Sequence, residues 1–377
     1  MIKRGPKSIL KHKKGDNALT DAKISTGKST GVGFLYFYIH LVTEVICFFM
    51  LKRYIGDSIG LYLIALAYDM LAFVPQGVIG YFADRHLRFP LSIVGLGLMA
   101  AALVLYNVGS LTVASLVLLC LGNCCTHVNG AEVTLRTSGG RLSPAAIFVS
   151  GGSFGVISGK LLGATLMPWW LLLILAASAI PFAYLAGMYL PDEKDTENPS
   201  GLQKCIGFDH YTKRLGGIVV VLAVAVVAFR GFIGYGIPSS WNKTVWQNVL
   251  LYVSMGVGKA LGGILSDFIG MRRTAVLSSL LCLPFLLFGD RIMIVSLIGV
   301  MLFSMTMSIT LALLVSAMPH EPGLAFGLTT LGLFIGTVPV FFVKFASLLS
   351  GGIVISAAVL LCAAALYYLC DGRNETK

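Results

Sequence analysis

Gly80-Tyr81-Phe82-Ala83-Asp84-Arg85-His86-Leu87-Arg88 is a short stretch between two long apolar runs, and Gly263-Ile264-Leu265-Ser266-Asp267-Phe268-Ile269-Gly270-Met271-Arg272-Arg273 repeats its pattern about half a chain later. Each copy places an aspartate and basic residues between the apolar runs. A polar hairpin of this kind joins two membrane helices on the basic side of the membrane. The sequence therefore predicts a protein with two related halves.

The composition indicates that the chain lies in a membrane. Of its 377 residues, 56% are hydrophobic and only 12% are charged, and the mean hydropathy is +0.85. Apolar runs of about 18 residues or more are typical of membrane-spanning helices. Because these runs are continuous and do not alternate, they exclude a transmembrane β-barrel. We therefore expect an all-α integral membrane protein.

Twelve apolar stretches predict twelve transmembrane helices, at residues 32–53, 58–83, 89–107, 111–135, 143–167, 169–190, 215–237, 244–267, 273–289, 292–317, 322–346 and 351–370. The longest internal polar segment separates the sixth helix from the seventh and predicts a linker. The expected organisation is a basic tail (1–31), a six-helix bundle (32–190), the linker (191–214), a second six-helix bundle (215–370) and a short tail (371–377).

The net charge of +11 is distributed as in a membrane protein. Eight of the 28 basic residues lie in the first 30 positions, and the loops that would face the other side hold only Lys52, Arg53, Lys243 and Arg291. The positive-inside rule then places both termini in the cytoplasm, with the basic tail against anionic lipid. We expect no nucleic-acid partner and no signal peptide. The short loops favour the plasma membrane of a bacterium.

The two polar stretches resemble the signature loop of the major facilitator superfamily, whose pattern is roughly Gly-x-x-x-Asp-Arg-x-Gly-Arg-Arg. The first copy keeps Gly80, Asp84, Arg85 and Arg88, with Leu87 at the second glycine position; the second keeps Gly263, Asp267, Gly270, Arg272 and Arg273, with Phe268 at the first arginine position. The resemblance implies a monomeric twelve-helix transporter. It also implies that these signature loops latch the two halves together on the cytoplasmic side.

Two predicted helices carry glycines on one face. The fifth contains Gly151, Gly155, Gly159 and Gly163, and the eleventh contains Gly323, Gly327, Gly332 and Gly336. Such faces allow close helix packing, which we expect at the mobile interface between the halves. The fifth helix is also loosely similar to that of drug–proton antiporters, although their Gly-Pro pair is absent. The chain as a whole is loosely similar to drug and fosmidomycin-resistance efflux members. An antiport-specific role is therefore the alternative.

Seven ionisable residues lie inside the predicted spans: Glu44, Asp69, Glu132, Lys160, Arg230, Lys259 and Lys344. A charged side chain at a helix centre costs about 2.5–3.5 kcal/mol on the insertion scale, so each needs a partner, a watery cavity or a function. In the superfamily, the first, fourth, seventh and tenth helices line the central cavity. The resemblance therefore directs attention to Glu44, Glu132 and Arg230.

The candidate proton carriers are Glu132, Glu44, His127 and His40. His40 and Glu44 are one turn apart in the first helix, where they either carry a proton or form a satisfied polar contact. In the fourth helix, Asn123, His127 and Gly130 share one stripe, and Asn129, Glu132 and Arg136 share another. The sequence does not say which stripe faces the cavity. Glu132 and Arg136 alternatively form an ion pair within the helix.

We expect no metal site and no cofactor. Cys124, Cys125 and His127 are neighbours in sequence, but adjacent cysteines point to different faces of a helix. The candidate substrate or counter-ion groups are Arg230, Lys160, Asn129, Asn123 and Tyr235. Arg230 would either hold an anionic group of the substrate or neutralise Glu44 or Glu132 across the cavity.

The chain contains no phosphate loop, no Gly-x-Ser-x-Gly and no His-Glu-x-x-His, so we expect neither an ATP-driven pump nor an enzyme. The hypothesis is a secondary transporter that exchanges protons for a small organic solute, with export favoured over import. The alternatives are a uniporter or importer without proton coupling, and a non-transporting sensor or assembly partner.

Overall fold

The computed structural model describes residues 26–55, 61–109, 112–190, 202–212, 216–237, 239–342 and 352–371, and every regular element in these ranges is a helix. The first half contains α1 (Thr26–Met50), the π-helical turn η1 (Leu51–Ile55), α2 (Leu61–Phe73), α3 (Gln76–Ala83), α4 (Leu91–Gly109), α5 (Thr112–Arg136), α6 (Ser143–Gly163) and α7 (Leu171–Gly187). The second half contains α8 (Gly217–Gly236), α9 (Val245–Ile269), α10 (Met271–Phe288), α11 (Met293–Ser304), α12 (Met307–Ala317), α13 (Pro322–Phe342) and α15 (Gly352–Leu369).

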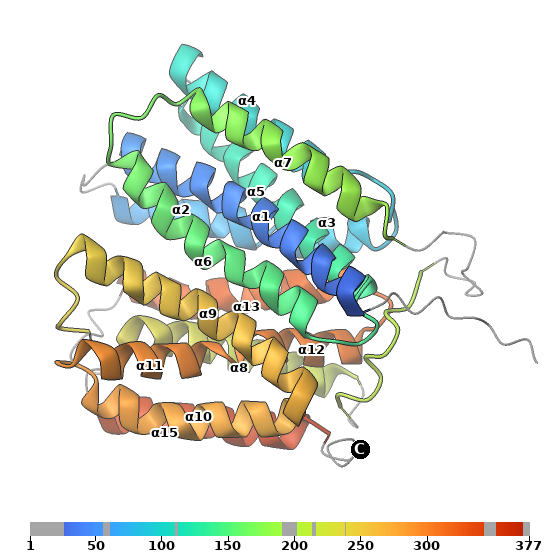
Figure 1. Ribbon diagram of the computed structural model, residues 1–377, viewed down its shortest axis with the longest axis vertical. Coiled ribbons are helices and arrows are strands. Elements are labelled where there is room, and N and C mark those ends of the chain that lie inside the picture. Colours follow the sequence, from blue (N-terminus) through green and yellow to red (C-terminus); the bar gives the residue numbers. More distant parts are fainter. Residues whose placement is uncertain are drawn as a thin grey trace, which may run out of the picture.

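These helices form twelve spans, because α1 continues into η1, α2 into α3 and α11 into α12. Within the described ranges, ten spans are long and apolar enough to cross a membrane, and α7 and α15 are shorter apolar helices. Figure 1 shows the first half (blue to green) as one bundle above the second half (yellow to red). The predicted fold class, an all-α membrane protein of two six-helix bundles, is confirmed.

The first helix begins at Thr26 instead of the predicted residue 32. Its first turns are polar, so hydropathy does not mark them as part of a span. They are stabilised from outside the helix, because Arg141 donates to the Thr26 carbonyl (3.0 Å) and to Ser29 Oγ (2.6 Å). The rest of the predicted basic tail, residues 1–25, lies outside the described residues, as does Lys344.

The glycine face of α6 packs against α1, inside the first bundle. A Cβ added to Gly155 would lie 2.5 Å from the Leu41 carbonyl oxygen, and one added to Gly159 would lie 2.6 Å from that of Val45. Gly151 and Gly163 approach the α1 backbone in the same way. The expectation that this face lies at the interface between the halves is therefore wrong. A repeat of four glycines predicts close packing but does not identify the neighbouring helix.

The glycines of α13 divide between two neighbours. Gly323 and Gly327 pack on α3, which belongs to the other half, whereas Gly332 and Gly336 pack on α8 of their own bundle. The expectation of an interface between the halves therefore holds for the first two only.

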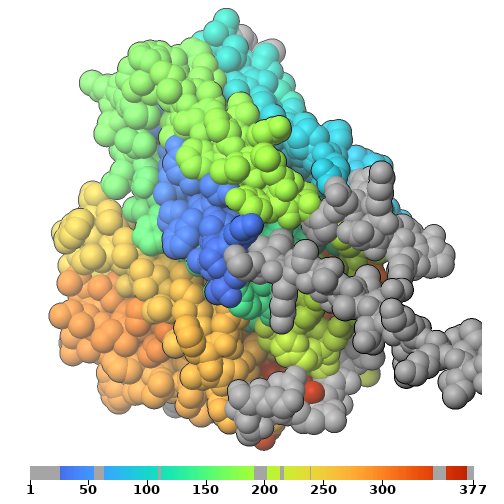
Figure 2. All heavy atoms as spheres, turned by 45° about the vertical axis from the view of Figure 1, so that its right-hand side comes forward, coloured from blue at the N-terminus to red at the C-terminus, as the bar shows by residue number. Residues whose placement is uncertain are grey.

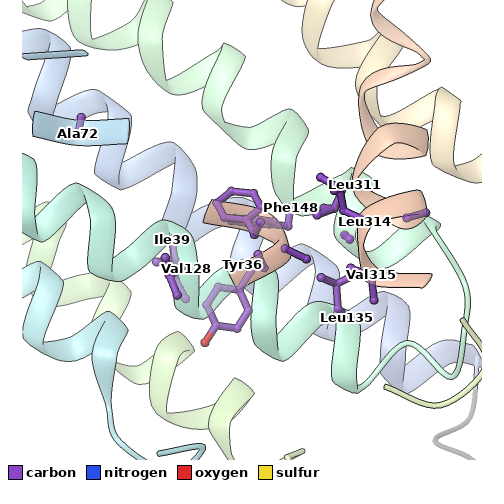
Figure 3. Packing of buried hydrophobic residues seen from close by; sticks show 14 of the residues in the cluster. Tyr36, Ile39, Ala72, Val128, Leu135, Phe148, Leu311, Leu314 and Val315 are labelled. Carbon is purple, nitrogen blue, oxygen red and sulfur yellow. The ribbon is translucent and has the colours of Figure 1, made fainter. Parts of the chain in front are cut away.

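The most extensive contacts between the bundles are those of α6 with α9 and of α13 with α3. Helix α13 also contacts α2 and α5, and α12 contacts α6. In the space-filling view, green atoms of the first half meet yellow atoms of the second half along the α6–α9 contact (Figure 2). Deeper in the molecule, Phe148 of α6 and Leu135 of α5 lie in the same buried region as Leu311, Leu314 and Val315 of α12 (Figure 3). Burial of these apolar side chains stabilises the contact between the halves.

The described part of the predicted linker, residues 202–212, is packed against both bundles. Cys205 N–H donates to the Pro319 carbonyl before α13 (2.7 Å), and Tyr211 Oη donates to the Gly140 carbonyl before α6. Phe208 is fully buried, and burial raises the pKa of Cys205 to about 12. The segment therefore covers the end of the molecule that holds the signature loops, which we call the signature-loop end.

Candidate functional site

The first signature loop caps a helix of the opposite half. Asp84 Oδ1 accepts from the N–H of Gly323 and Oδ2 accepts from the N–H of Leu324, both at 2.9 Å. These two N–H groups belong to the first turn of α13, where the helix offers no carbonyl partners. A carboxylate at a helix N-terminus is also favoured by the helix dipole. Gly80 allows α3 to approach the start of α13 this closely, because a Cβ at this position would overlap the Gly323 carbonyl.

Arg136, the last residue of α5, connects this cap to Glu132. Its Nη2 lies 3.1 Å from Asp84 Oδ1, and its Nε lies 3.3 Å from Glu132 Oε1. All three side chains are almost completely buried. Glu132 Oε2 is buried without a hydrogen-bond partner in the described structure. One guanidinium is thus shared by two buried carboxylates, and its single positive charge cannot neutralise both.

The second signature loop repeats the cap in the other direction. Asp267 Oδ1 accepts from Leu142 N–H at 2.7 Å, and Oδ2 accepts from Ser143 N–H at 3.0 Å, at the start of α6. A Cβ on Gly263 would lie 2.9 Å from the Leu142 carbonyl oxygen. We call the two aspartate caps together the latch, because each joins one half to the other at the signature-loop end.

The two caps differ in their ionic partners. In addition to the Arg136–Asp84 ion pair, the first loop has one between Arg85 and Glu321, at 2.9 Å. For Asp267, the hydrogen bonds observed within the described ranges come from backbone N–H groups. Two further motif residues act inside the second bundle: Gly270 adopts φ = 93° between α9 and α10, and Arg272 lies 3.6 Å from the Tyr367 ring centroid.

Replacing Arg85 with glutamine is expected to weaken the latch only slightly. The Arg85–Glu321 pair is partly exposed, with side-chain exposures of 30% and 25%. Exposed pairs of this kind contribute about 0–1 kcal/mol. The measurement is the melting temperature of R85Q in detergent at low and at 1 M salt. A decrease of no more than about 2–4 °C is expected, and failure of R85Q to fold would contradict the prediction.

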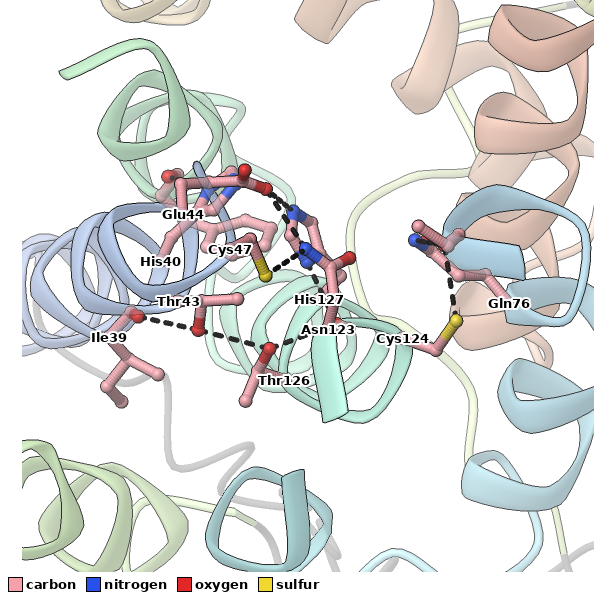
Figure 4. Close-up of polar contacts among 12 residues, drawn as sticks. Ile39, His40, Thr43, Glu44, Cys47, Gln76, Asn123, Cys124, Thr126 and His127 are labelled. Atoms are coloured by element: carbon pink, nitrogen blue, oxygen red, sulfur yellow. Dashed lines mark hydrogen bonds and ion pairs between the residues drawn. The ribbon is translucent and has the colours of Figure 1, made fainter. Parts of the chain in front are cut away.

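A second polar group lies between α1 and α5. Glu44 Oε1 is 3.2 Å from His127 Nε2, 3.8 Å from His40 Nε2 and 3.2 Å from Asn123 Nδ2. Figure 4 shows these four side chains converging between the two helices. All of them are buried. We call His40, Glu44, Asn123 and His127 the central cluster.

Backbone carbonyls orient both imidazole rings. His40 Nδ1 donates to the Phe148 carbonyl and His127 Nδ1 donates to the Asn123 carbonyl, each at 2.9 Å. A carbonyl oxygen can only accept, so the hydrogen of each neutral ring lies on Nδ1 and the Nε2 lone pair faces Glu44. Gly152 leaves room for this arrangement, because a Cβ there would lie 2.5 Å from His40 Nε2.

Charges from other helices act on the central cluster. Lys259 of α9, in the second half, lies within electrostatic range of Glu44 and of His40. Asp69 of α2 lies within electrostatic range of Glu44. The sequence singles out both residues as intramembrane charges but does not connect them with Glu44. The connection is invisible in the sequence because it crosses between helices, and in the case of Lys259 between halves.

The structure separates the two stripes of α5. Asn123 and His127 face Glu44, whereas Asn129 accepts from Tyr36 Oη (2.9 Å) and Ser92 Oγ (2.7 Å) and so joins α1, α4 and α5. Cys124 Sγ lies 3.1 Å from the Ala72 carbonyl, on the α2 side of the helix. His127 is close to Cys124 and Cys125 in the sequence, but in the structure its side chain lies beside His40 and Glu44.

The remaining candidates lie elsewhere. Lys160 Nζ donates to Tyr252 Oη at 2.8 Å and thereby joins α6 to α9. Arg230 donates to the Phe303 carbonyl and lies 4.6 Å from the Phe303 ring centroid. Among the described residues it forms no ion pair with Glu44 or Glu132, so the expectation that it neutralises one of them is not met. Tyr235 is 62% exposed and lies within electrostatic range of Asp69.

Comparison with solved structures identifies the fold. The chain is similar to the human organic anion transporter MFSD10 (TETRAN), with a TM-score of 0.66 and 14% identity over 90% of this chain and 99% of that chain. It is also similar to a single-residue variant of the Escherichia coli fucose:proton symporter FucP, with a TM-score of 0.56 and 15% identity over 90% and 96% of the two chains. A structure of the major facilitator transporter FucP in the outward conformation gives a TM-score of 0.58 and 13% identity over the same shares. The sequence matches no family model and no curated protein.

Proposed function

We propose that this chain, which has the fold of the major facilitator transporters, moves a small solute across the membrane by alternating access. The observation that carries the proposal is that Asp84 and Asp267 each cap a helix of the opposite half. The halves can separate at this end only by breaking both caps. A solute site between the halves would then open towards the side of the membrane where the signature loops lie.

The central cluster is the proposed solute site. It is buried, it contains one carboxylate and two imidazoles, and it lies within electrostatic range of Lys259 from the other half. A rocking movement of the halves would change the distance between Lys259 and Glu44, so the charge of the site would differ between the two conformations. Intramembrane ionisable groups are costly and typically mark the pathway of a solute or ion.

Glu132 is the proposed carrier of the coupled proton. Its Oε2 is buried without a partner in the described structure, and its Oε1 shares Arg136 with Asp84. The charged and titratable groups around it are Arg136, Asp84, Tyr36 and Cys205. A protonated Glu132 would leave Arg136 to Asp84 alone and so favour the closed latch. Release of the proton would make Glu132 compete for Arg136 and weaken the cap.

The proposed cargo is a small organic solute, and the proposed direction is export across a plasma membrane by a monomer. The basic loops support a cytoplasmic position for both termini and for the signature-loop end. The loose similarity to drug and fosmidomycin-resistance efflux members supports export.

Everted membrane vesicles that carry a luminal pH probe test this proposal. The vesicles are energised and then challenged with small organic anions, cations and neutral solutes. Export coupled to protons would raise the luminal pH on addition of one solute class. We expect the response to fall at least tenfold in E132Q, because glutamine cannot carry the proton, and to persist in D209N, which alters an exposed carboxylate at the same end. Labelled solute that moves without a pH change, equally in E132Q, would indicate a uniporter or importer instead.

A further inference from the structure

We propose that His40, Glu44 and His127 form a binding site for a divalent transition-metal ion. In the transport proposed above, this ion is the cargo, either held by the small organic solute as its chelator or free in place of that solute. One ligand atom from each of the three residues lies within 4.8 Å of the other two. All three residues are buried, so bulk water does not compete with them as it would at a surface site. The inference rests on the proposed function for the role of the ion as cargo, but not for its binding.

The arrangement of lone pairs is the first argument. Both Nδ1–H groups are bound to backbone carbonyls, so both Nε2 atoms offer lone pairs towards Glu44 Oε1. Metal-binding histidines are typically oriented in this way, with the second ring nitrogen donating to a carbonyl or carboxylate. Three acceptors that converge in a buried place repel one another unless a cation lies between them.

The distances are close to those of a metal site. Four ligands around Zn²⁺ at 2.0–2.1 Å are about 3.3 Å apart in a tetrahedron. Glu44 Oε1 is 3.2 Å from His127 Nε2 and 3.8 Å from His40 Nε2. Small rotations of the side chains would therefore bring all three atoms to a common ion.

Asn123 offers an independent observation. Its Oδ1 is buried and has no hydrogen-bond partner in the described structure, while its Nδ2 lies 3.2 Å from Glu44 Oε1. A half-turn of the amide about its Cβ–Cγ bond exchanges the two atoms and would place a neutral oxygen beside the other three ligands. The half-turn would give the oxygen the ion as its partner, in exchange for the Nδ2 contacts with Cys47 Sγ (3.5 Å) and Tyr68 Oη (3.3 Å).

The chemistry of the ligands selects the class of ion. Two imidazoles with a carboxylate suit zinc, iron, nickel or copper, whereas calcium and magnesium favour sites made of oxygen atoms only. The surrounding charges permit a divalent cation. Glu44 and Asp69 offer two carboxylates against the single ammonium group of Lys259, so cationic groups do not outnumber acidic groups around the site.

Metal binding by the purified full-length protein tests the inference without reference to transport. Metal-free protein in detergent is titrated with Co²⁺ alone, whose visible spectrum reports ligation, and then with Zn²⁺ alone by calorimetry. We expect one equivalent to bind, with affinity at least tenfold weaker in H40Q, E44Q and H127Q. H86Q, whose histidine lies in the loop after α3 and outside the cluster, is expected to bind as wild type does.

Wild-type protein that binds no Co²⁺ or Zn²⁺, or that binds it equally well in all three variants, would overturn the inference and leave a shared proton as the occupant of the cluster. Absence of binding by the wild-type protein overturns the inference even if a variant fails to fold. The conservative variant N123D adds a second readout, because a carboxylate there is expected to tighten binding and to shift the Co²⁺ spectrum.

Proteoliposomes separate this inference from the proposed function and distinguish the two forms of cargo. Uptake of Zn²⁺ alone would identify the free ion, whereas uptake only with a small carboxylate chelator would identify the complex. Stoichiometric binding without either uptake would refute the proposed transport of the ion while the binding site stands. Transport of an organic solute that is unaffected by removal of all metal would support transport and overturn the ion as cargo.

Discussion

Replacing Gly80 with alanine is expected to hold the signature-loop end open and to reduce transport roughly fivefold or more. The added Cβ would overlap the Gly323 carbonyl and lie 2.7 Å from Leu324 N, so α3 could no longer approach the first turn of α13. Both obstacles are backbone atoms, which cannot rotate away as a side chain does. Overpacking costs about 1–3 kcal/mol, which would shift the equilibrium between closed and open latch roughly 5- to 150-fold.

Gly77 provides the matched control for this prediction. It lies one turn earlier on α3, and a Cβ there would meet no atom within 4 Å. The measurement is the distance between spin labels at two exposed positions of opposite halves, introduced as Phe89→Cys and Phe268→Cys. G80A is expected to populate a longer distance, and G77A to match the unmodified pair. Identical distance distributions in G80A and G77A would contradict the role of Gly80 in the latch.

Replacing Arg136 with glutamine is expected to have the largest effect on stability. Arg136 is the shared ionic partner of Asp84 and Glu132, and all three side chains are almost fully buried. Removing one member of a buried ion pair leaves an uncompensated charge and costs about 3–5 kcal/mol. The melting temperature and the yield of monodisperse protein in detergent measure this loss.

The double variant R136Q/E132Q tests the reason for the loss. Because E132Q removes one of the two orphaned charges, the double variant is expected to be more stable than R136Q alone. The control is R141Q, whose arginine donates to Thr26 and Ser29 and to no carboxylate in the described structure. Loss of such bonds costs about 0.5–1.5 kcal/mol each. Equal destabilisation by R136Q and R141Q would show that the contribution of Arg136 to stability does not come from its buried ion pairs.

Much of the architecture is readable from the sequence because a lipid environment leaves few choices. A backbone in hydrocarbon must satisfy its own polar groups, so apolar runs of sufficient length become helices. For this reason all twelve spans were predictable, and the ends of most agree closely with those of the helices. The exception at Thr26 arises because a polar turn is stabilised by Arg141, more than a hundred residues away.

The candidate site was only partly predictable. The sequence singles out Glu44, His40, His127 and Asn123 as polar groups inside apolar helices, and the structure brings these four together. The sequence places Asn129 on a different stripe of the helix, but it does not show that Asn129 binds Tyr36 or that Arg230 lies against Phe303. Helical periodicity states which residues share a face, but not which helix lies opposite that face.

The sequence by itself determined the fold class, an all-α membrane protein, together with its helices, its two halves and the two loops that resemble each other. Only the tertiary structure decided the partners: the helix N-termini that Asp84 and Asp267 cap, the guanidinium that Asp84 shares with Glu132, and the convergence of α1 and α5 on one carboxylate. The physical reason is the separation along the chain over which each kind of interaction acts. Hydropathy and helix formation act on neighbours in the chain, whereas caps, ion pairs and ligand sets join groups that come together only after the helices have packed.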